Sequence, residues 1–163
     1  MRHKSSLLLV FPIFFQCAFW GNALAEEFLK APDFEMSDLR GEMQSPSQHR
    51  GDYLILYFWA TWCPACRQDV ENIKGVYERF HPKGLEFISI SLDSDLAKLE
   101  QFVETKEIHY PVLYDGKGWG NEIAQLYGVN STPTFLLIDP DQKVISSGNR
   151  IRKIEAFLKN IFS

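Results

Sequence analysis

The strongest constraint on the fold of this chain is an apolar run over residues 53–59, which leads shortly afterwards into Cys63-Pro64-Ala65-Cys66. The run has the length and composition of a strand that is buried on both faces. Apolar side chains then recur at helical spacing over residues 64–80, which predicts an amphipathic helix. A strand that leads into a CxxC pair at the start of a helix is typical of a redox-active dithiol.

The same spacing indicates how the two cysteines would react. Pro64 falls at the first helical position, where a missing N–H costs nothing and the fixed φ of proline suits the helix. Cys63 then lies at the helix N-terminus, where free N–H groups and the positive end of the helix dipole favour a thiolate. We therefore expect a lowered pKa and a raised reactivity for Cys63. Cys66 is close enough to resolve a mixed disulfide by intramolecular attack.

The rest of the chain alternates strand and helix patterns, and the first strand–helix–strand crossover predicts a parallel pair. The expected strands are 53–59, 85–92, 110–114, 135–138 and 143–147. The expected helices are 64–80, 95–106, 120–127 and 151–162. Asp93 or Ser94 is the expected cap of the second helix, and Gly128 the left-handed end of the third. Turn signals within residues 28–51 predict a short N-terminal hairpin.

Periodicity also predicts which helix faces point inward. The expected inner faces are Val70, Ile73, Tyr77 and Phe80 in the first helix, Leu96, Leu99, Phe102 and Val103 in the second, and Ile154, Phe157, Leu158 and Ile161 in the last.

The N-terminus has the pattern of a secretory signal peptide. Basic residues at positions 2–4 precede an apolar stretch over 7–15, and Ala23-Leu24-Ala25 has the form of a cleavage site. We expect cleavage after Ala25, which leaves a single domain over residues 26–163 in the periplasm or another exported location. Two alternatives stay open: the segment could remain as an uncleaved anchor, or Cys17 could be lipidated, although Gln16 is the wrong residue before a lipidated cysteine.

Composition further narrows the classes of protein to which this chain can belong. The chain has 163 residues, 45% of them hydrophobic, which fits one domain with a normal core. Its net charge of −4 gives no indication of nucleic-acid binding. Removal of the leader also removes Cys17, so both remaining cysteines belong to the CxxC motif. An exported protein with one such pair is not a disulfide-stapled scaffold, and the Cys63–Cys66 pair is expected to be a working disulfide.

With these motifs the chain resembles the thioredoxin superfamily, and more narrowly the exported TlpA/ResA/DsbE (CcmG-like) thiol-disulfide oxidoreductases with a redoxin or AhpC-TSA-like domain. The resemblance rests on Ala31-Pro32-Asp33-Phe34, on Phe58-Trp59-Ala60-Thr61-Trp62-Cys63-Pro64-Ala65-Cys66-Arg67, on the helical insert near 95–106 and on Thr132-Pro133-Thr134. It implies an α/β, thioredoxin-like fold: a central mixed sheet flanked by helices, with an N-terminal β-hairpin extension and a helical insert.

The resemblance also implies roles for individual residues. Cys63 would be the exposed nucleophile and Cys66 the buried resolving thiol. Pro133 would be a cis-proline facing the dithiol, and Thr132 would offer its backbone to an extended substrate. Trp62 and Pro64, which flank Cys63, complete the expected substrate-binding residues.

Two positions depart from the pattern of plain thioredoxins. Their buried aspartate in the strand before the motif is replaced by Tyr57, which does not serve as a base near neutral pH. TlpA/ResA-type members carry an acid, usually glutamate, three residues after the second cysteine, and Asp69 stands there. Because residues three apart share a helix face, Asp69 is a candidate to relay the proton of Cys66. The simpler interpretation is an ordinary acid near a helix N-terminus, stabilised by the dipole.

Other site types fit the sequence less well. A zinc site would need two further soft ligands, and His49, His81 and His109 lack metal spacing. A peroxidase of the peroxiredoxin type would carry a threonine three residues before its cysteine, whereas Thr61 is two before Cys63. A redox-dependent binding module or a metallochaperone is the alternative from outside the enzymes.

The function expected from the sequence is exported disulfide reduction without a bound cofactor or metal. The expected partners are a disulfide-bearing protein substrate, with the oxidised CxxCH motif of apocytochrome c as the candidate that the resemblance suggests, and a membrane-embedded thiol reductase as electron donor. General thiol-disulfide exchange on other exported proteins, in either redox direction, is the alternative. We expect a monomer.

Overall fold

The computed structural model describes residues 30–163, so the expected signal peptide, its cleavage after Ala25 and the thiol of Cys17 lie outside the described residues. Within them, no helix has the length and apolar character needed to span a membrane. The strands are β1 (Met36–Ser37), β2 (Met43–Gln44), β3 (Tyr53–Trp59), β4 (Leu85–Ser91), β5 (Val112–Leu113), β6 (Thr134–Ile138) and β7 (Val144–Gly148). The α-helices are α2 (Pro64–Phe80), α3 (Leu96–Thr105), α4 (Glu122–Leu126) and α5 (Ile151–Ile161), and the short 3₁₀ helices are η1 (Pro46–His49), η2 (His81–Lys83) and η3 (Gly118–Gly120).

The main sheet is mixed and has β3 at its centre. Its five strands are ordered β5-β4-β3-β6-β7, with β3 parallel to β4 and antiparallel to β6. All residues of β3 after Tyr53 are buried, as the apolar run predicts for a strand with neighbours on both edges and cover on both faces. The predicted parallel strand pair and the mixed thioredoxin-like sheet are confirmed.

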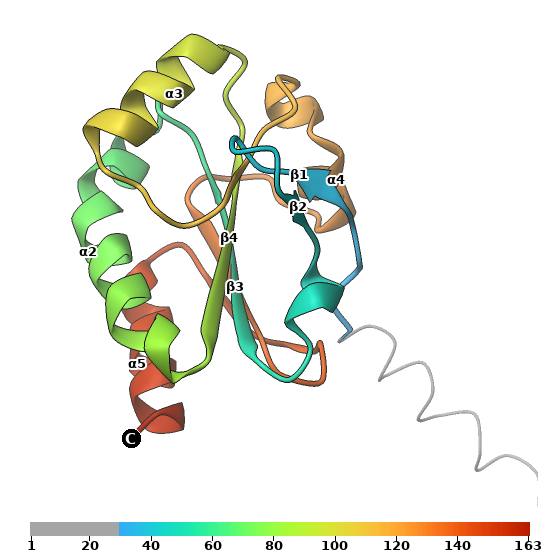
Figure 1. The fold of residues 1–163 in the computed structure, drawn as a ribbon, viewed down its shortest axis with the longest axis vertical. Helices are drawn as coiled ribbons and strands as arrows, with labels where there is room; N and C mark the ends of the chain where they lie inside the picture. Colours follow the sequence, from blue (N-terminus) through green and yellow to red (C-terminus); the bar gives the residue numbers. More distant parts are fainter. Residues whose placement is uncertain (1–29) are drawn as a thin grey trace, which may run out of the picture.

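Helices cover both faces of this sheet. Figure 1 shows α2 and α5 side by side on one face, and α4 with the N-terminal segment on the other. Helix α3, the predicted insert, lies beside α2: Phe102 of α3 lines one cleft with Pro64 and Arg67 of α2. Further along α2, the Lys74 side chain donates a hydrogen bond to the Lys106 carbonyl at 2.9 Å. The CxxC end of α2 is therefore framed by a second helix.

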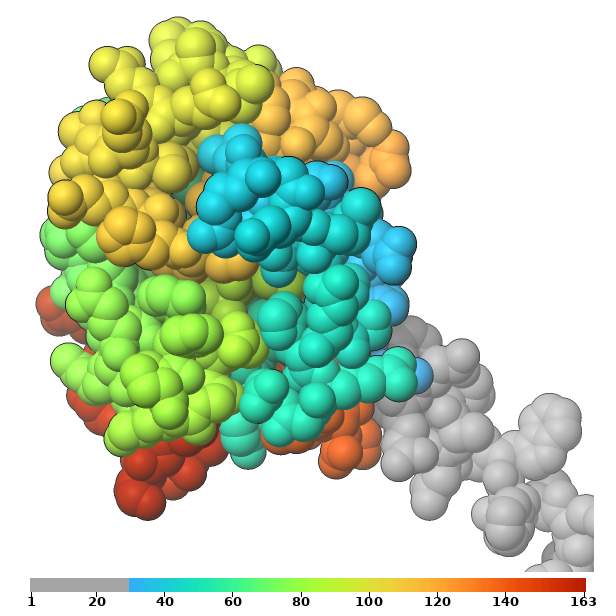
Figure 2. All heavy atoms as spheres, in the orientation of Figure 1, coloured from blue at the N-terminus to red at the C-terminus, as the bar shows by residue number. Residues whose placement is uncertain are grey.

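The predicted N-terminal hairpin forms as the pair β1–β2. Figure 2 shows this segment lying across the front of the molecule, between α3 and the start of β3. It is tied down by the Leu39 amide, which donates to the Val112 carbonyl at 2.9 Å, and by the Ala31 amide, which donates to the Gln142 carbonyl at 2.8 Å. These bonds tie the N-terminal segment to the edge strand β5 and to the turn before β7.

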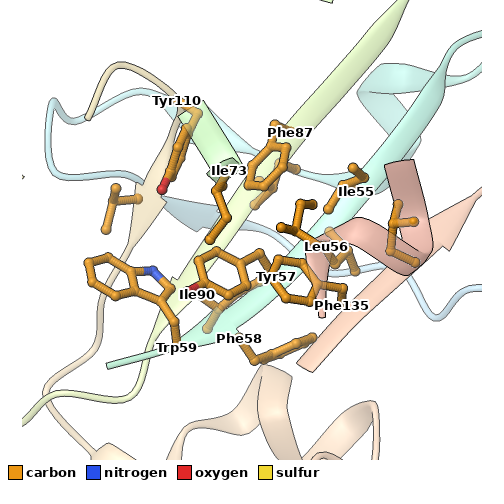
Figure 3. Packing of buried hydrophobic residues seen from close by; sticks show 14 of the residues in the cluster. Ile55, Leu56, Tyr57, Phe58, Trp59, Ile73, Phe87, Ile90, Tyr110 and Phe135 are labelled. Carbon is orange, nitrogen blue, oxygen red and sulfur yellow. The ribbon is translucent and has the colours of Figure 1, made fainter. Parts of the chain in front are cut away.

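An aromatic stack fills the core behind the dithiol. The Tyr57 ring lies parallel to that of Phe135, with centroids 4.4 Å apart, and to that of Trp59 at 6.0 Å (Figure 3). The rings of Phe87 and Tyr110 pack at 4.7 Å alongside. Since each of these side chains is almost wholly buried, the stack fixes the direction in which β3 leaves the sheet toward Cys63.

Some local predictions are wrong. The cap of α3 is Asp95, whose carboxyl group accepts from the Lys98 amide at 3.2 Å, and neither Asp93 nor Ser94. Leu96 and Phe157 were expected to point inward, but each is 42% exposed. The amphipathic stripe of each helix is narrower than the periodicity suggests, because Leu99 in α3 and Ile154 with Leu158 in α5 already provide the buried contact.

Gly128 and Gln142 are among the turn residues with positive φ. Gly128 closes α4 with a φ of 64°, as predicted. Gln142 takes a φ of 66° in the tight turn between β6 and β7. The turn is stabilised by the Asp139 carboxyl group, which accepts from the amides of Asp141 and Lys143 at 3.0 and 2.8 Å. These bonds offset the cost of a non-glycine residue in the left-handed region.

Tyr57 offers a test of the aromatic stack. Its hydroxyl group is buried and hydrogen-bonds to no described residue. Tyr57→Phe is therefore expected to change the free energy of unfolding by less than about 1 kcal/mol, whereas Tyr57→Ala, which removes both stacked contacts, should lower it by about 3–5 kcal/mol. Urea unfolding of the oxidised proteins measures both. Equal losses in the two variants would show that the hydroxyl group, not the ring, stabilises the core.

Candidate active site

Cys63 is the N-cap of α2, and its sulfur caps the first turn. Its Sγ accepts a hydrogen bond from the Cys66 amide at 3.2 Å and is joined to the Cys66 sulfur in a disulfide. The expected pairing is thus present, and Pro64 occupies the first helical position as predicted. Cys63 is only 3% exposed and Cys66 is fully buried, so the expectation of an openly exposed Cys63 is wrong. Because the Cys63 sulfur points toward the helix amides, little of its surface is accessible to an incoming disulfide.

A buried carboxyl group holds the loop that precedes the dithiol. The Asp93 carboxyl group accepts from the Thr61 amide at 3.0 Å, from the Thr61 hydroxyl at 2.6 Å and from the Ser91 hydroxyl at 2.8 Å. Asp93 is 3% exposed. It therefore fixes the position of Thr61, two residues before the sulfur.

This role was not predicted from the sequence, in which Asp93 was a candidate helix cap. A signal was available: β3 and β4 are parallel, and Trp59 is aligned with Ser91, so the residues just after both strands meet at one edge of the sheet. Polar side chains at the carboxyl ends of neighbouring parallel strands are therefore candidates for contact with each other.

The Thr132–Pro133 peptide bond is cis, as the resemblance implies. Thr132 and Pro133 line a cleft of about 460 Å³ beside the dithiol, together with Ala65 and Asp69. The structure thus brings the CxxC turn and the proline loop, which are far apart in the sequence, to the same cleft.

Two exposed tryptophans lie on another side of the dithiol. Trp62 is 51% exposed and Trp119, in η3, is 47% exposed, and their ring centroids are 6.2 Å apart. Trp62, an expected substrate-binding residue, is thus accessible to a partner. Large exposed aromatic side chains that face each other are a common contact surface for protein partners.

Asp69 is half-buried on the first turns of α2 and lines the same cleft as Pro133. Its described hydrogen bond comes from the Asn72 amide group at 3.0 Å, not from a cysteine. Burial raises the pKa of Tyr57 well above its usual value, and the neighbouring Tyr110 and Asp69 add to the shift. Tyr57 therefore stays neutral near pH 7.

Residues 30–163 contain no group of three or more histidine, cysteine, aspartate or glutamate side chains placed to hold a metal ion.

The model of the family described as AhpC/TSA matches residues 29–147. The chain belongs to the AhpC/TSA family. Within it, the chain is 33% identical over 135 residues to the thiol-disulfide oxidoreductase ResA of Bacillus thuringiensis subsp. konkukian, covering 81% of this chain and 76% of that protein. The ResA of Oceanobacillus iheyensis is 28% identical over 138 residues, covering 80% of this chain and 70% of its own. The protein is a thiol-disulfide oxidoreductase of this kind.

Solved structures agree with this assignment. A thiol:disulfide interchange protein DsbE from Chlorobium tepidum superposes with a TM-score of 0.70 at 31% identity, over 81% of this chain and 92% of that one. A thiol-disulfide oxidoreductase from Bacteroides fragilis superposes with a TM-score of 0.74 at 27% identity, over 81% and 98%. The predicted thioredoxin-like fold and the predicted oxidoreductase class are confirmed.

The Asp93 contacts lead to a stability prediction. Asp93→Ala leaves three buried or half-buried donors without their acceptor and should lower the free energy of unfolding by about 2–4 kcal/mol. Asp95→Ala is the matched control, because it removes an exposed helix cap and should cost about 1 kcal/mol. Denaturant unfolding of both variants measures the difference. A larger loss in the Asp95 variant would contradict the assignment of the two carboxyl groups.

Proposed function

We propose that this thiol-disulfide oxidoreductase works as an exported disulfide reductase. The observation that carries the proposal is the Cys63 sulfur at the N-terminus of α2, with Cys66 buried behind it. In the reduced protein the free amides and the helix dipole stabilise a thiolate at Cys63. Apolar burial disfavours a thiolate at Cys66, so the two sulfurs take different roles.

The reaction proceeds in two displacements. The Cys63 thiolate attacks one sulfur of the substrate disulfide, forms a mixed disulfide and releases the second substrate sulfur as a thiolate. The Cys66 sulfur then attacks Cys63, forms the intramolecular disulfide and releases the first substrate sulfur. Two electrons pass from the cysteine pair to the substrate, and the two substrate thiols take up one proton from Cys66 and one from solvent. A reductant must then restore the dithiol.

The substrate is held across the Thr132–Pro133 loop. The Thr132 backbone offers a hydrogen-bonding edge to an extended segment, and Pro133 and Pro64 provide the apolar walls that bring its disulfide to Cys63. Trp62, with half of its surface exposed beside the nucleophile, packs against the same segment. Backbone recognition of this kind accepts many sequences, which suits an enzyme that acts on protein disulfides.

Asp69 is the proposed proton relay for Cys66. It lies one helical turn after Cys66 and on the wall of the substrate cleft. An acid there can take the Cys66 proton as that sulfur attacks the mixed disulfide. Its side chain is one methylene shorter than the glutamate usual in TlpA/ResA-type proteins, so the relay passes through a water molecule.

The compartment and the partners follow from the leader-like N-terminus and from the resemblance. A cleaved signal peptide places residues 26–163 in the periplasm. There a dithiol survives only if electrons reach it, and a membrane-embedded thiol reductase is the proposed donor. The proposed substrate is the oxidised CxxCH haem-attachment motif of apocytochrome c.

Single-cysteine variants test the reductase mechanism. Cys63→Ser should abolish reduction of a protein disulfide, because no nucleophile remains at the helix N-terminus. Cys66→Ser should accumulate a covalent complex with a peptide carrying an oxidised CxxCH motif, which non-reducing electrophoresis and mass spectrometry detect. A complex that forms through position 66 in the Cys63 variant at the wild-type rate would contradict the assigned roles.

The Asp69 proposal has its own test. Asp69→Asn should slow the release of substrate from the mixed disulfide by about 10–100-fold and should alter the pH dependence of that step, while the rate of initial attack by Cys63 changes less. Rapid-quench kinetics between pH 5 and 9 separate the two steps. The control is Asp52→Asn, an exposed carboxyl group at the start of β3. An unchanged pH–rate profile in the Asp69 variant would remove the relay from the mechanism.

A further inference from the structure

The CxxC turn forms a ridge between two clefts. Pro64 lines one of them, of about 500 Å³, and Ala65 lines the other, of about 460 Å³, although the two residues are neighbours between the cysteines. Gln68, one turn further along α2, lines both. A polypeptide that presents a disulfide to Cys63 therefore has one cleft on either side of the reacting sulfurs.

Both clefts are basic. Arg67 and Lys106 line the cleft on the α3 side. Arg150 and Arg152 line the cleft on the α5 side, where Asp69 is the only acidic lining residue. The whole chain has a net charge of −4, so the positive charge around the dithiol is opposite in sign to the net charge of the protein.

The arginines of these clefts are not neutralised within the described part of the chain. The side chains of Arg67, Arg150 and Arg152 are exposed and form no ion pair or hydrogen bond with residues 30–163. Two other arginines are paired, Arg40 with Asp38 at 3.0 Å and Arg79 with Glu155 at 2.6 Å. Arginine forms planar, bidentate contacts with carboxylates, so three unpaired arginines around one ridge fit acidic side chains of a partner.

We infer that the two clefts select protein substrates whose disulfide is flanked by aspartate or glutamate residues. The inference rests on the proposed reductase function and adds the chemistry of the substrate that it prefers. Opposite charges at the rim of a contact raise the association rate and the discrimination between partners more than the final affinity. Salt screens such contacts over a Debye length of about 10 Å at 0.1 M, so the preference should be salt-dependent.

Three peptides of equal length test the inference. Each carries the same intramolecular disulfide, flanked by aspartates, serines or lysines, and is mixed with the reduced protein in stopped-flow experiments. At about 20 mM salt the aspartate peptide should be reduced about tenfold faster than the lysine peptide, with the serine peptide between them. At about 0.5 M salt the three rates should agree within about twofold.

Charge variants show which arginines cause the preference for acidic peptides. Arg67→Gln and the double variant Arg150→Gln/Arg152→Gln should each reduce the ratio of the aspartate rate to the lysine rate, and the triple variant should bring it close to one. The ratio is measured within each variant, because loss of a nearby cation also changes the fraction of Cys63 thiolate. Arg50→Gln is the matched control: Arg50 is exposed and lines a different cleft, so this variant should keep the wild-type ratio.

The outcomes separate this inference from the reductase proposal. A reduced protein that fails to reduce even the serine peptide contradicts the reductase proposal itself. Equal rates for the three peptides, with normal reduction of the serine peptide, overturn only the inference of acidic selection. A loss of preference in the Arg50 variant as large as in the cleft variants also overturns it, because net charge alone would then account for the effect.

Discussion

The hydrogen bond from the Cys66 amide to the Cys63 sulfur joins the chemistry of this molecule to its fold. It makes the sulfur the cap of α2, so that the reactive atom takes the place of an ordinary side-chain acceptor at a helix N-terminus. The position of that helix depends in turn on β3, whose burial on both faces fixes where the strand ends. The reactivity proposed for Cys63 thus follows from how a buried strand passes into a helix.

The sheet topology then gathers the remaining groups around this point. Because β4 is parallel to β3, its carboxyl end brings Asp93 against Thr61. Because β6 is antiparallel to β3, it starts beside the end of β3, and the cis Thr132–Pro133 bond just before it lies next to the CxxC turn. The basic clefts are assembled from the same neighbourhoods, with Arg67 on α2 and Arg150 at the start of α5.

How far the sequence predicts this structure depends on whether a feature is local. The run over 53–59, the helix over 64–80 and the cysteine pair were predicted correctly, since spacing along the chain determines them. Asp93 and Asp95 look alike in sequence, and only the approach of Thr61 gives the first a buried role and leaves the second as the cap. The sequence also does not show that Arg67 and Arg150 lie on either side of the CxxC turn, because this placement depends on the packing of α5 against α2.

The reduction potential of the Cys63–Cys66 pair distinguishes a disulfide reductase from a disulfide donor. It is measured by equilibration against a thiol redox buffer, with the two forms separated after alkylation. The account predicts a reducing pair, close to the value of about −270 mV typical of thioredoxin, which an electron donor must keep reduced in an oxidising compartment. A value near about −120 mV, as in DsbA, would mean that the dithiol is the more stable form and that the protein donates disulfides, which would contradict the proposed direction of the reaction.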